Sequence, residues 1–111
     1  MILDESALLE EVDGDRDLLT RWIEIFDRDC NNRLPKLRAA VESCDCETLM
    51  SEAHAIKGGL GVLFAKSAYE TAYKLELMGR NADATNAVVT FQQLEGEIRS
   101  LRVVLGNLVA S

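Results

Sequence analysis

The sequence is poor in proline and in aromatic residues, and this limits the possible folds. Only one proline, Pro35, occurs in 111 residues, and aromatic residues make up 5%. A β-rich chain with many tight turns needs more proline than this. Alanine, leucine, glutamate and arginine are abundant instead, and these are good helix formers. We therefore expect an all-helical protein.

The chain also lacks positive charge and long apolar runs. Lysine and arginine number 12 against 19 acidic residues, for a net charge of −7. There is no basic run, so nucleic acid and anionic membranes are poor partners, because both are bound mainly through lysine and arginine. No run of about 18 apolar residues exists to span a bilayer. The acidic N-terminus has no apolar core, so we expect no signal peptide.

Cysteines are few, and their spacing argues against a disulfide framework. Cys30, Cys44 and Cys46 are odd in number, which favours free thiols and a cytoplasmic location. A metal site built from Cys44, Cys46 and His54 is an alternative, but it lacks a fourth ligand and its C-x-C spacing is too short for a usual zinc site. We expect no metal. A chain of this length buries enough surface to fold without such supports, so residues 1–111 are expected to form a single domain.

Apolar residues recur every three or four positions along the chain, the spacing of amphipathic helices. The second stripe stays in phase across Pro35, which predicts one long, kinked helix. Gly79 is a candidate helix stop. Aspartates 4, 15 and 45 are candidate N-caps. The expected helices cover residues 4–12, the stretch from the cap at Asp15 to Val41, the stretch from the cap at Asp45 to about Ala65, residues from about 66 to 78, and residues 88–108, with a turn at 43–47.

Four long amphipathic helices joined by short turns must bury their stripes against one another. Short connections force neighbouring helices to run antiparallel. The sequence therefore predicts an all-α, antiparallel up-down-up-down four-helix bundle. The short extra N-terminal helix is expected to cap one end.

The only histidine, His54, lies in the segment AHAIKGGLG at residues 53–61, which also contains three glycines. Each glycine inside a helix costs roughly 1 kcal/mol relative to alanine. Helical residues three, four and seven apart share a face, and the inward stripe through Ala53 and Ile56 is rotated away from His54. The imidazole is therefore expected to point outward. Its face also contains Glu47, Met50, Ser51, Lys57, Gly58 and Gly61.

This face suits phosphoryl chemistry. A neutral imidazole nitrogen is a competent nucleophile near neutral pH. A phosphoryl group on it would add about two negative charges, which Lys57 would stabilise. Missing side chains at Gly58 and Gly61 would leave room for a large partner to approach. Gly59 points elsewhere and is attributed to helix packing.

The same segment resembles the H-x-(L/I)-K-G core of histidine-containing phosphotransfer (HPt) domains. The lead-in from Leu8 to His54, with its acidic turns and phenylalanine-containing helix, is also similar to the family, and KLELMGR at 74–80 resembles the L-E-x-x-G-R segment that follows. One departure stands out. Many members have glycine ten residues after the histidine, where this chain has Phe64, whose ring either packs into the bundle or forms an apolar spot near the docking surface.

The resemblance implies a phosphorelay intermediate with His54 as phosphoacceptor and Lys57 as the family's lysine. Its partners would be receiver domains of response regulators or hybrid histidine kinases, docking around Met50, Ser51, Gly58 and Gly61. The receiver would supply the phosphoaspartate and Mg²⁺, so this chain would need no cofactor and little catalysis of its own. We expect a monomer.

Two other functions remain open at this stage. The chain could be the phosphoacceptor domain of a chemotaxis-type histidine kinase, which also shows IKGG followed by another glycine. It could instead be a helical interaction module that takes no phosphate.

Overall fold

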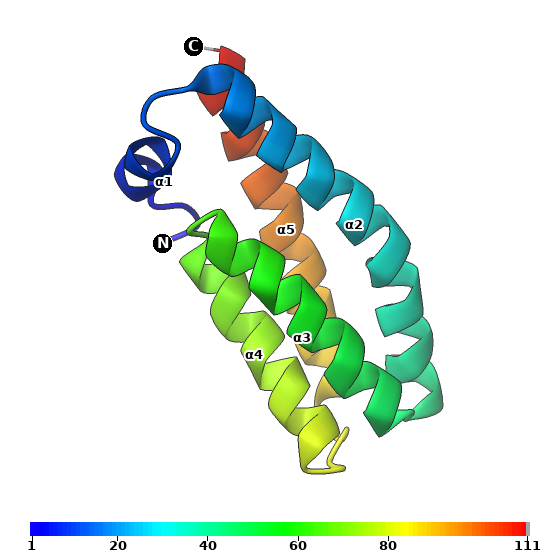
Figure 1. Ribbon diagram of the computed structural model, residues 1–111. Helices are drawn as coiled ribbons and strands as arrows, with labels where there is room; N and C mark the ends of the chain where they lie inside the picture. The colour runs from blue at the N-terminus through cyan, green and yellow to red at the C-terminus, as the bar shows by residue number, and fades with distance from the viewer. Residues whose placement is uncertain (111) are drawn as a thin grey trace.

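The computed structural model describes residues 1–110, and this part of the chain forms five helices and no strand (Figure 1). The prediction of an all-helical chain with a short first helix is confirmed. The helices are α1 (Glu5–Glu11), α2 (Arg16–Ser43), α3 (Cys46–Val62), α4 (Lys66–Arg80) and α5 (Ala87–Ala110). None of the helices in this range is both long and apolar enough to cross a bilayer.

The first three helices begin where the sequence predicted. In each case an aspartate side chain accepts a hydrogen bond from a backbone N–H three residues later, which satisfies a donor that the helix cannot pair. Pro35 lies inside α2, which continues through it as one helix. The three caps are Asp4 to Ala7, Asp15 to Leu18, and Asp45 to Thr48.

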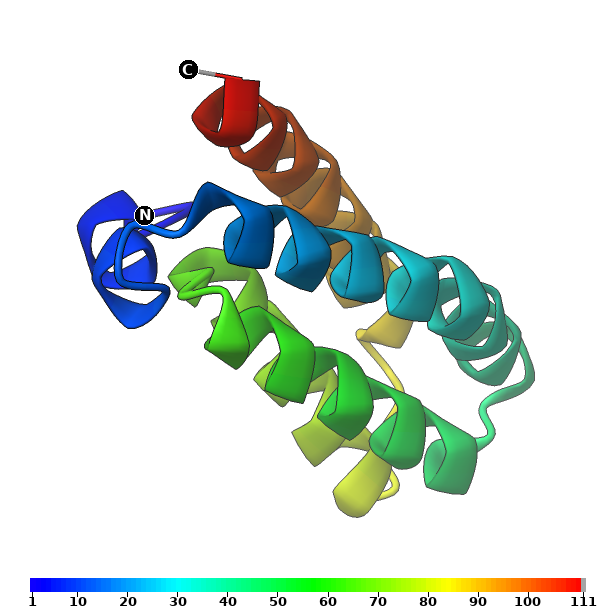
Figure 2. The same ribbon diagram turned by 45° about the horizontal axis from the view of Figure 1, so that its top comes forward.

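The four long helices form a closed antiparallel bundle with extents of 42 × 23 × 18 Å. Helix α3 packs against α2 and α4, and α5 packs against both α4 and α2. Figure 2 shows α1 lying at the end of the bundle where α3 turns into α4. The backbone N–H of Asp4 donates to the carbonyl of Phe64 in that turn, at 3.0 Å. The N-terminal segment is thus attached to the α3–α4 turn.

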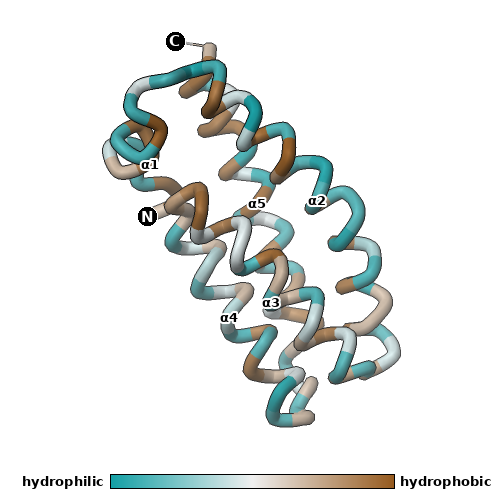
Figure 3. Tube along the Cα trace, in the orientation of Figure 1, coloured by the Kyte–Doolittle hydropathy of each residue, from teal (hydrophilic) through white to brown (hydrophobic). Residues whose placement is uncertain are grey.

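The core is mainly aliphatic and is shared by all five helices. Hydrophobic positions recur along each helix with polar ones between them (Figure 3), and the hydrophobic ones turn inward. Burying each leucine or isoleucine fully stabilises the fold by roughly 1.5–3 kcal/mol. The largest fully buried side chains are Leu8, Leu19, Leu37, Leu49, Ile56, Leu60, Leu63, Leu75, Leu94, Ile98, Leu101 and Leu105.

The prediction that Gly79 ends α4 is wrong. Helix α4 continues to Arg80, and Gly79 is buried inside it. A Cβ atom at Gly79 would lie 2.6 Å from the backbone nitrogen of Met50 and 2.7 Å from the carbonyl oxygen of Cys46. Glycine is needed here because α3 and α4 approach each other backbone to backbone.

Helix α3 ends at Val62, three residues earlier than predicted. Phe64 follows in the left-handed conformation, with φ of +58°. Glycine adopts this conformation without steric cost, which accounts for a glycine at this position in many HPt domains. The Phe64 ring is half-buried and packs against the core, so the first of the two expectations for it is correct.

Candidate functional site

His54 lies in the middle of α3 with its imidazole outside the bundle. Its side chain is 67% exposed, whereas its neighbours Ala53 and Ile56 are buried. The predicted outward orientation is confirmed. The ring is nevertheless not free, because Nδ1 lies 3.2 Å from Oε1 of Glu76 on α4.

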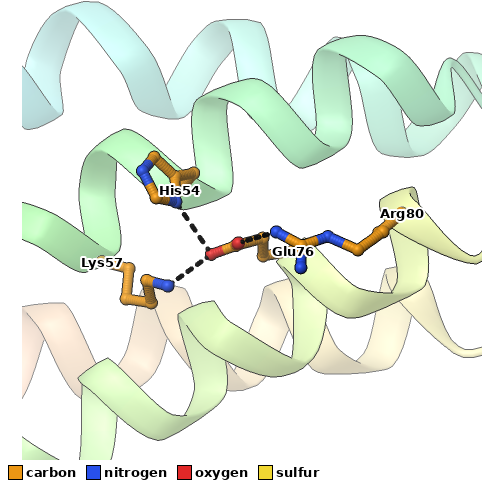
Figure 4. A network of polar contacts seen from close by, with 4 residues as sticks. All are labelled: His54, Lys57, Glu76 and Arg80. Carbon is orange, nitrogen blue, oxygen red and sulfur yellow. Dashed lines mark hydrogen bonds and ion pairs between the residues drawn. The ribbon is translucent and has the colours of Figure 1, made fainter.

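Glu76 is the centre of a polar network that joins α3 to α4 (Figure 4). Its carboxylate is only 2% exposed, and Oε1 also lies 2.7 Å from Nζ of Lys57. The other oxygen, Oε2, lies 2.7 Å from the Arg80 guanidinium, one helical turn further along α4. A buried carboxylate without cationic partners would be strongly unfavourable. Two cations and the imidazole provide those partners here.

These contacts set the charge of Glu76. Burial alone would raise the pKa of the carboxyl. Hydrogen bonds from Lys57 and His54, together with the charges of both groups, lower the pKa by a larger amount, so the net pKa lies below its ordinary value. Glu76 is therefore ionised at neutral pH. An ionised carboxylate only accepts hydrogen bonds. The neutral imidazole must then carry its proton on Nδ1, which leaves the lone pair on Nε2.

The sequence predicted that Lys57 shares a face of α3 with His54 and would stabilise a phosphoryl group there, but it did not predict what the lysine contacts. Its side chain is only 15% exposed, and its ammonium is bound to Glu76. The hydrogen bond to Glu76 raises the pKa of Lys57, so the ammonium stays charged. Lys57 thus shares one carboxylate oxygen with the imidazole of His54 instead of standing alone in solvent.

The three glycines near His54 have different surroundings. Gly58 is exposed, and a Cβ there would meet nothing within 4 Å, so this flank of the helix is open. A Cβ on Gly59 would touch the ring of Phe26 at 3.4 Å, which confirms its packing role. A Cβ on Gly61 would lie 3.3 Å from the ring of Tyr69. The expected clearance is therefore present at Gly58, while at Gly61 part of the space belongs to this chain's own tyrosine.

The other two residues expected at the docking face are also placed by the structure. Ser51 is exposed on α3, one turn before His54. Met50 is half-buried, because its backbone lies against Gly79 of α4. Met50 is thus at the edge of the face, and Ser51 is on it.

Sequence reasoning assigned no role to Glu76 and Arg80, although both lie in the KLELMGR segment that resembles the family's L-E-x-x-G-R segment. A second signal was the inward position of Glu76 on α4, four residues after Ala72 and three before Gly79, both of which are buried. An acidic residue on an inward stripe requires a charged partner. The sequence alone did not show that the partner belonged to the histidine helix.

Cys44 and Cys46 do not form a metal site with His54. Among residues 1–110, no group of three or more His, Cys, Asp or Glu side chains is arranged to hold a metal ion. All three cysteines are free thiols, and Cys30 is buried in the core.

An exposed histidine halfway along one helix of a four-helix bundle is the arrangement expected of a histidine-containing phosphotransfer domain. Residues 21–103 match the family model for the Hpt domain, and the chain belongs to this family. The structure is similar to the crystal structure of histidine-containing phosphotransfer protein B (HptB) from Pseudomonas aeruginosa PAO1. The TM-score is 0.90 at 25% sequence identity, over 98% of this chain and 95% of that chain. The comparison with curated proteins gave no match. The protein thus has a histidine phosphotransfer role in a phosphorelay, in which Hpt domains exchange phosphate with receiver domains.

Proposed function

We propose that His54 is the phosphoacceptor of this domain. It takes a phosphoryl group from the phosphoaspartate of one receiver domain and passes it to the aspartate of another. The observation that carries the proposal is the exposed imidazole with Nδ1 held by the buried carboxylate of Glu76. His54 is also the only histidine in the chain, so no second imidazole competes for the role.

The geometry assigns a task to each ring nitrogen. The Nε2 lone pair attacks the phosphorus of the aspartyl phosphate, the Nε2–P bond forms, and the P–O bond to the aspartate breaks. The aspartate leaves as a carboxylate, and the proton on Nδ1 remains there. The phosphorylated ring is then cationic, and the carboxylate of Glu76 beside Nδ1 stabilises that charge. Transfer to the next receiver reverses these steps.

Lys57 acts in this proposal mainly through Glu76. Its ammonium offsets the negative charge of a carboxylate that would otherwise face an incoming phosphoryl group. It also adds positive charge beside the imidazole, which favours the dianionic phosphoryl group. The proposal thereby keeps the predicted role of Lys57 in stabilising the phosphoryl group, with its ammonium held on Glu76.

The receiver would dock on the exposed ridge of α3 formed by Ser51, His54 and Gly58, with Met50 and Gly61 at its α4 edge. A half-open apolar groove of about 300 Å³ lies on the other flank, between α2 and α3. Such a groove beside a polar ridge is a favourable docking surface for a protein partner. The groove is lined by Trp22, Ile25, Phe26, Asp29, Gly59, Val62 and Leu63.

Several further features belong to the proposal. The domain works as a monomer, in the cytoplasm, where its three thiols stay reduced. The Mg²⁺ needed for transfer is bound by the receiver, and this chain contributes no metal ligand of its own. The net charge of −7 disfavours nucleic acid as a partner.

The test is phosphotransfer from a receiver domain labelled on its aspartate. The wild-type chain should gain an acid-labile, base-stable label, as phosphohistidine does. His54→Gln should gain none while keeping its helical circular dichroism. A label of the same intensity on His54→Gln would show that the site is elsewhere. Absence of label on the wild-type chain with every receiver of the source organism would contradict the proposal and favour either an interaction module or a phosphoacceptor domain of a chemotaxis-type kinase.

A further inference from the structure

Two tyrosine rings of α4 contact Lys57 in addition to Glu76. The ammonium nitrogen lies 4.8 Å from the centre of the Tyr73 ring and 5.9 Å from that of Tyr69. Both distances are within the range of cation–π attraction. Residues 69, 73 and 76 are four and three apart, so the two rings and the Glu76 carboxylate line one face of α4.

The backbone of α3 is shaped to admit one of these rings. The Tyr69 ring lies where a side chain at Gly61 would stand, with Cε2 3.3 Å from a Cβ built there. The Tyr69 ring therefore packs against α3 at Gly61, one turn beyond Lys57. The rings themselves remain partly exposed, at 37% for Tyr69 and 44% for Tyr73, so core formation alone does not explain their position.

A lysine on a helix surface ordinarily samples many rotamers, because its side chain has four rotatable bonds and its ammonium is strongly hydrated. Lys57 instead has its stem covered and its charge directed at a single carboxylate oxygen. That oxygen is also the one that faces Nδ1 of His54. Anything that fixes the ammonium therefore also fixes the acceptor of the imidazole proton.

We propose that Tyr73, supported by Tyr69, is a positioning residue for phosphotransfer: the rings keep Lys57 on Glu76, and Glu76 thereby stays against Nδ1 of His54 before a phosphoryl group arrives. Neither tyrosine touches the reacting atoms in this proposal. The inference depends on the proposed role of His54 for its kinetic consequence, but the hold on Lys57 is a property of the unphosphorylated chain. The two are therefore tested separately.

The first test is structural and needs no phosphate. In the NMR spectrum of the wild-type chain, the Cε protons of Lys57 should show an upfield ring-current shift. Tyr73→Phe, which keeps the ring, should preserve that shift. Tyr73→Leu should move it most of the way towards the shift of the solvent-exposed Lys36. A Lys57 signal that is already at the exposed value in the wild type would overturn the proposal.

The second test is kinetic and uses a receiver domain phosphorylated with acetyl phosphate, at saturating concentration in single turnover. Tyr73→Leu should slow transfer to His54 about two- to fivefold, the factor that corresponds to a partly exposed cation–π contact, with little change in the receiver concentration at half-saturation. Tyr73→Phe should restore the wild-type rate. The thermal midpoint of Tyr73→Phe should stay at the wild-type value, and that of Tyr73→Leu should fall by only a few degrees, because the contact with Lys57 is partly exposed.

A double variant separates positioning from docking. If Tyr73 acts through Lys57, Tyr73→Leu should have no further effect on transfer in the Lys57→Met background. A two- to fivefold loss that persists in that background, or a loss confined to the half-saturating concentration, would show that the ring contacts the receiver instead, and the proposal would be wrong. If the wild-type chain accepts no phosphoryl group, the proposed role of His54 is contradicted. The NMR comparison still tests whether the tyrosine rings hold Lys57, because it needs no phosphate.

Discussion

The Nδ1 atom of His54 lies 3.2 Å from Oε1 of Glu76, so an exposed ring on one helix is oriented by a buried carboxylate on the next. This contact converts an ordinary surface histidine into one with a defined tautomer. The same carboxylate is bound to Lys57 and Arg80, so the orientation of the ring depends on how α3 and α4 pack.

Replacing the carboxylate by an amide tests this relationship. Glu76→Gln keeps the shape of the side chain but loses the charge that holds the Nδ1 proton and stabilises the phosphorylated ring. We expect phosphoryl acceptance to slow by about tenfold to a hundredfold, the effect found when a metal-bound histidine loses the partner that orients it. Stopped-flow or quench transfer from a labelled receiver measures it. Arg80→Gln, which leaves Oε1 and its partners in place, is the matched control and should cost much less. Equal rates for Glu76→Gln and the wild type would contradict the orienting role.

Glu76 also predicts how stability depends on pH. Its pKa is lowered from the ordinary value of 4.5 in the folded protein, so the native state binds the proton less readily than the unfolded chain. The ionised form therefore stabilises the fold above about pH 4.5, and this contribution disappears as the pH falls through the folded pKa. The difference in unfolding free energy between the wild type and Glu76→Gln, measured with urea, should be largest near pH 7 and shrink towards pH 3. A difference independent of pH would show that the charge of Glu76 contributes no stability.

Gly58 should be the glycine at which bulk blocks function without harming the fold. A Cβ there meets no atom within 4 Å, so a large side chain would extend into solvent beside His54. Gly58→Phe should reduce transfer from a receiver by at least about tenfold, because a steric clash at the docking surface weakens binding of the receiver by at least that factor. Gly106→Phe places the same ring at an equally open position on α5 and should leave transfer unchanged. Normal transfer by Gly58→Phe would exclude this flank from the docking surface.

Gly79 and Gly96 should respond oppositely to the same substitution. At Gly79 a Cβ would lie 2.6 Å from the Met50 backbone, so alanine must push α3 and α4 apart, at a cost of about 1–3 kcal/mol. At Gly96 in α5 the space is open, and alanine should stabilise the helix by about 0.5–1 kcal/mol. Thermal unfolding of both variants measures the contrast. Because Gly79→Ala shifts the helix that carries Glu76, it should slow transfer as well, and a stable, fully active Gly79→Ala would refute the close approach of the two helices.

The fold followed from the sequence because its signals are local. Helix stripes and aspartate caps depend on residues three or four apart, and α1, α2 and α3 begin where the caps predict. The exposure of His54 and the packing role of Gly59 followed from the same periodicity. The misjudged positions depend on contacts between helices. From the sequence alone, Gly79 is typical of a helix end, and only the contact with the α3 backbone explains why glycine is needed there.

The same limit explains what was missed at the site. Glu76 and His54 are 22 residues apart, and periodicity shows only that each helix has an inward and an outward face. It does not show that the edge of one outward face meets a buried acid on the next helix. The contact of Lys57 with Glu76 was not predicted for this reason, and Gly61 was expected to be clear because the Tyr69 ring comes from another helix.

The position of the phosphoryl group on the ring tests the central claim most directly. Two-dimensional ¹⁵N–¹H NMR of the phosphorylated, uniformly ¹⁵N-labelled chain distinguishes the two ring nitrogens of the only histidine. With Nδ1 held by Glu76, the phosphorus should be bonded to Nε2 of His54, and Nδ1 should keep its proton. A phosphoryl group on Nδ1 would contradict the account, because it would require the contact between His54 and Glu76 to be absent when transfer occurs.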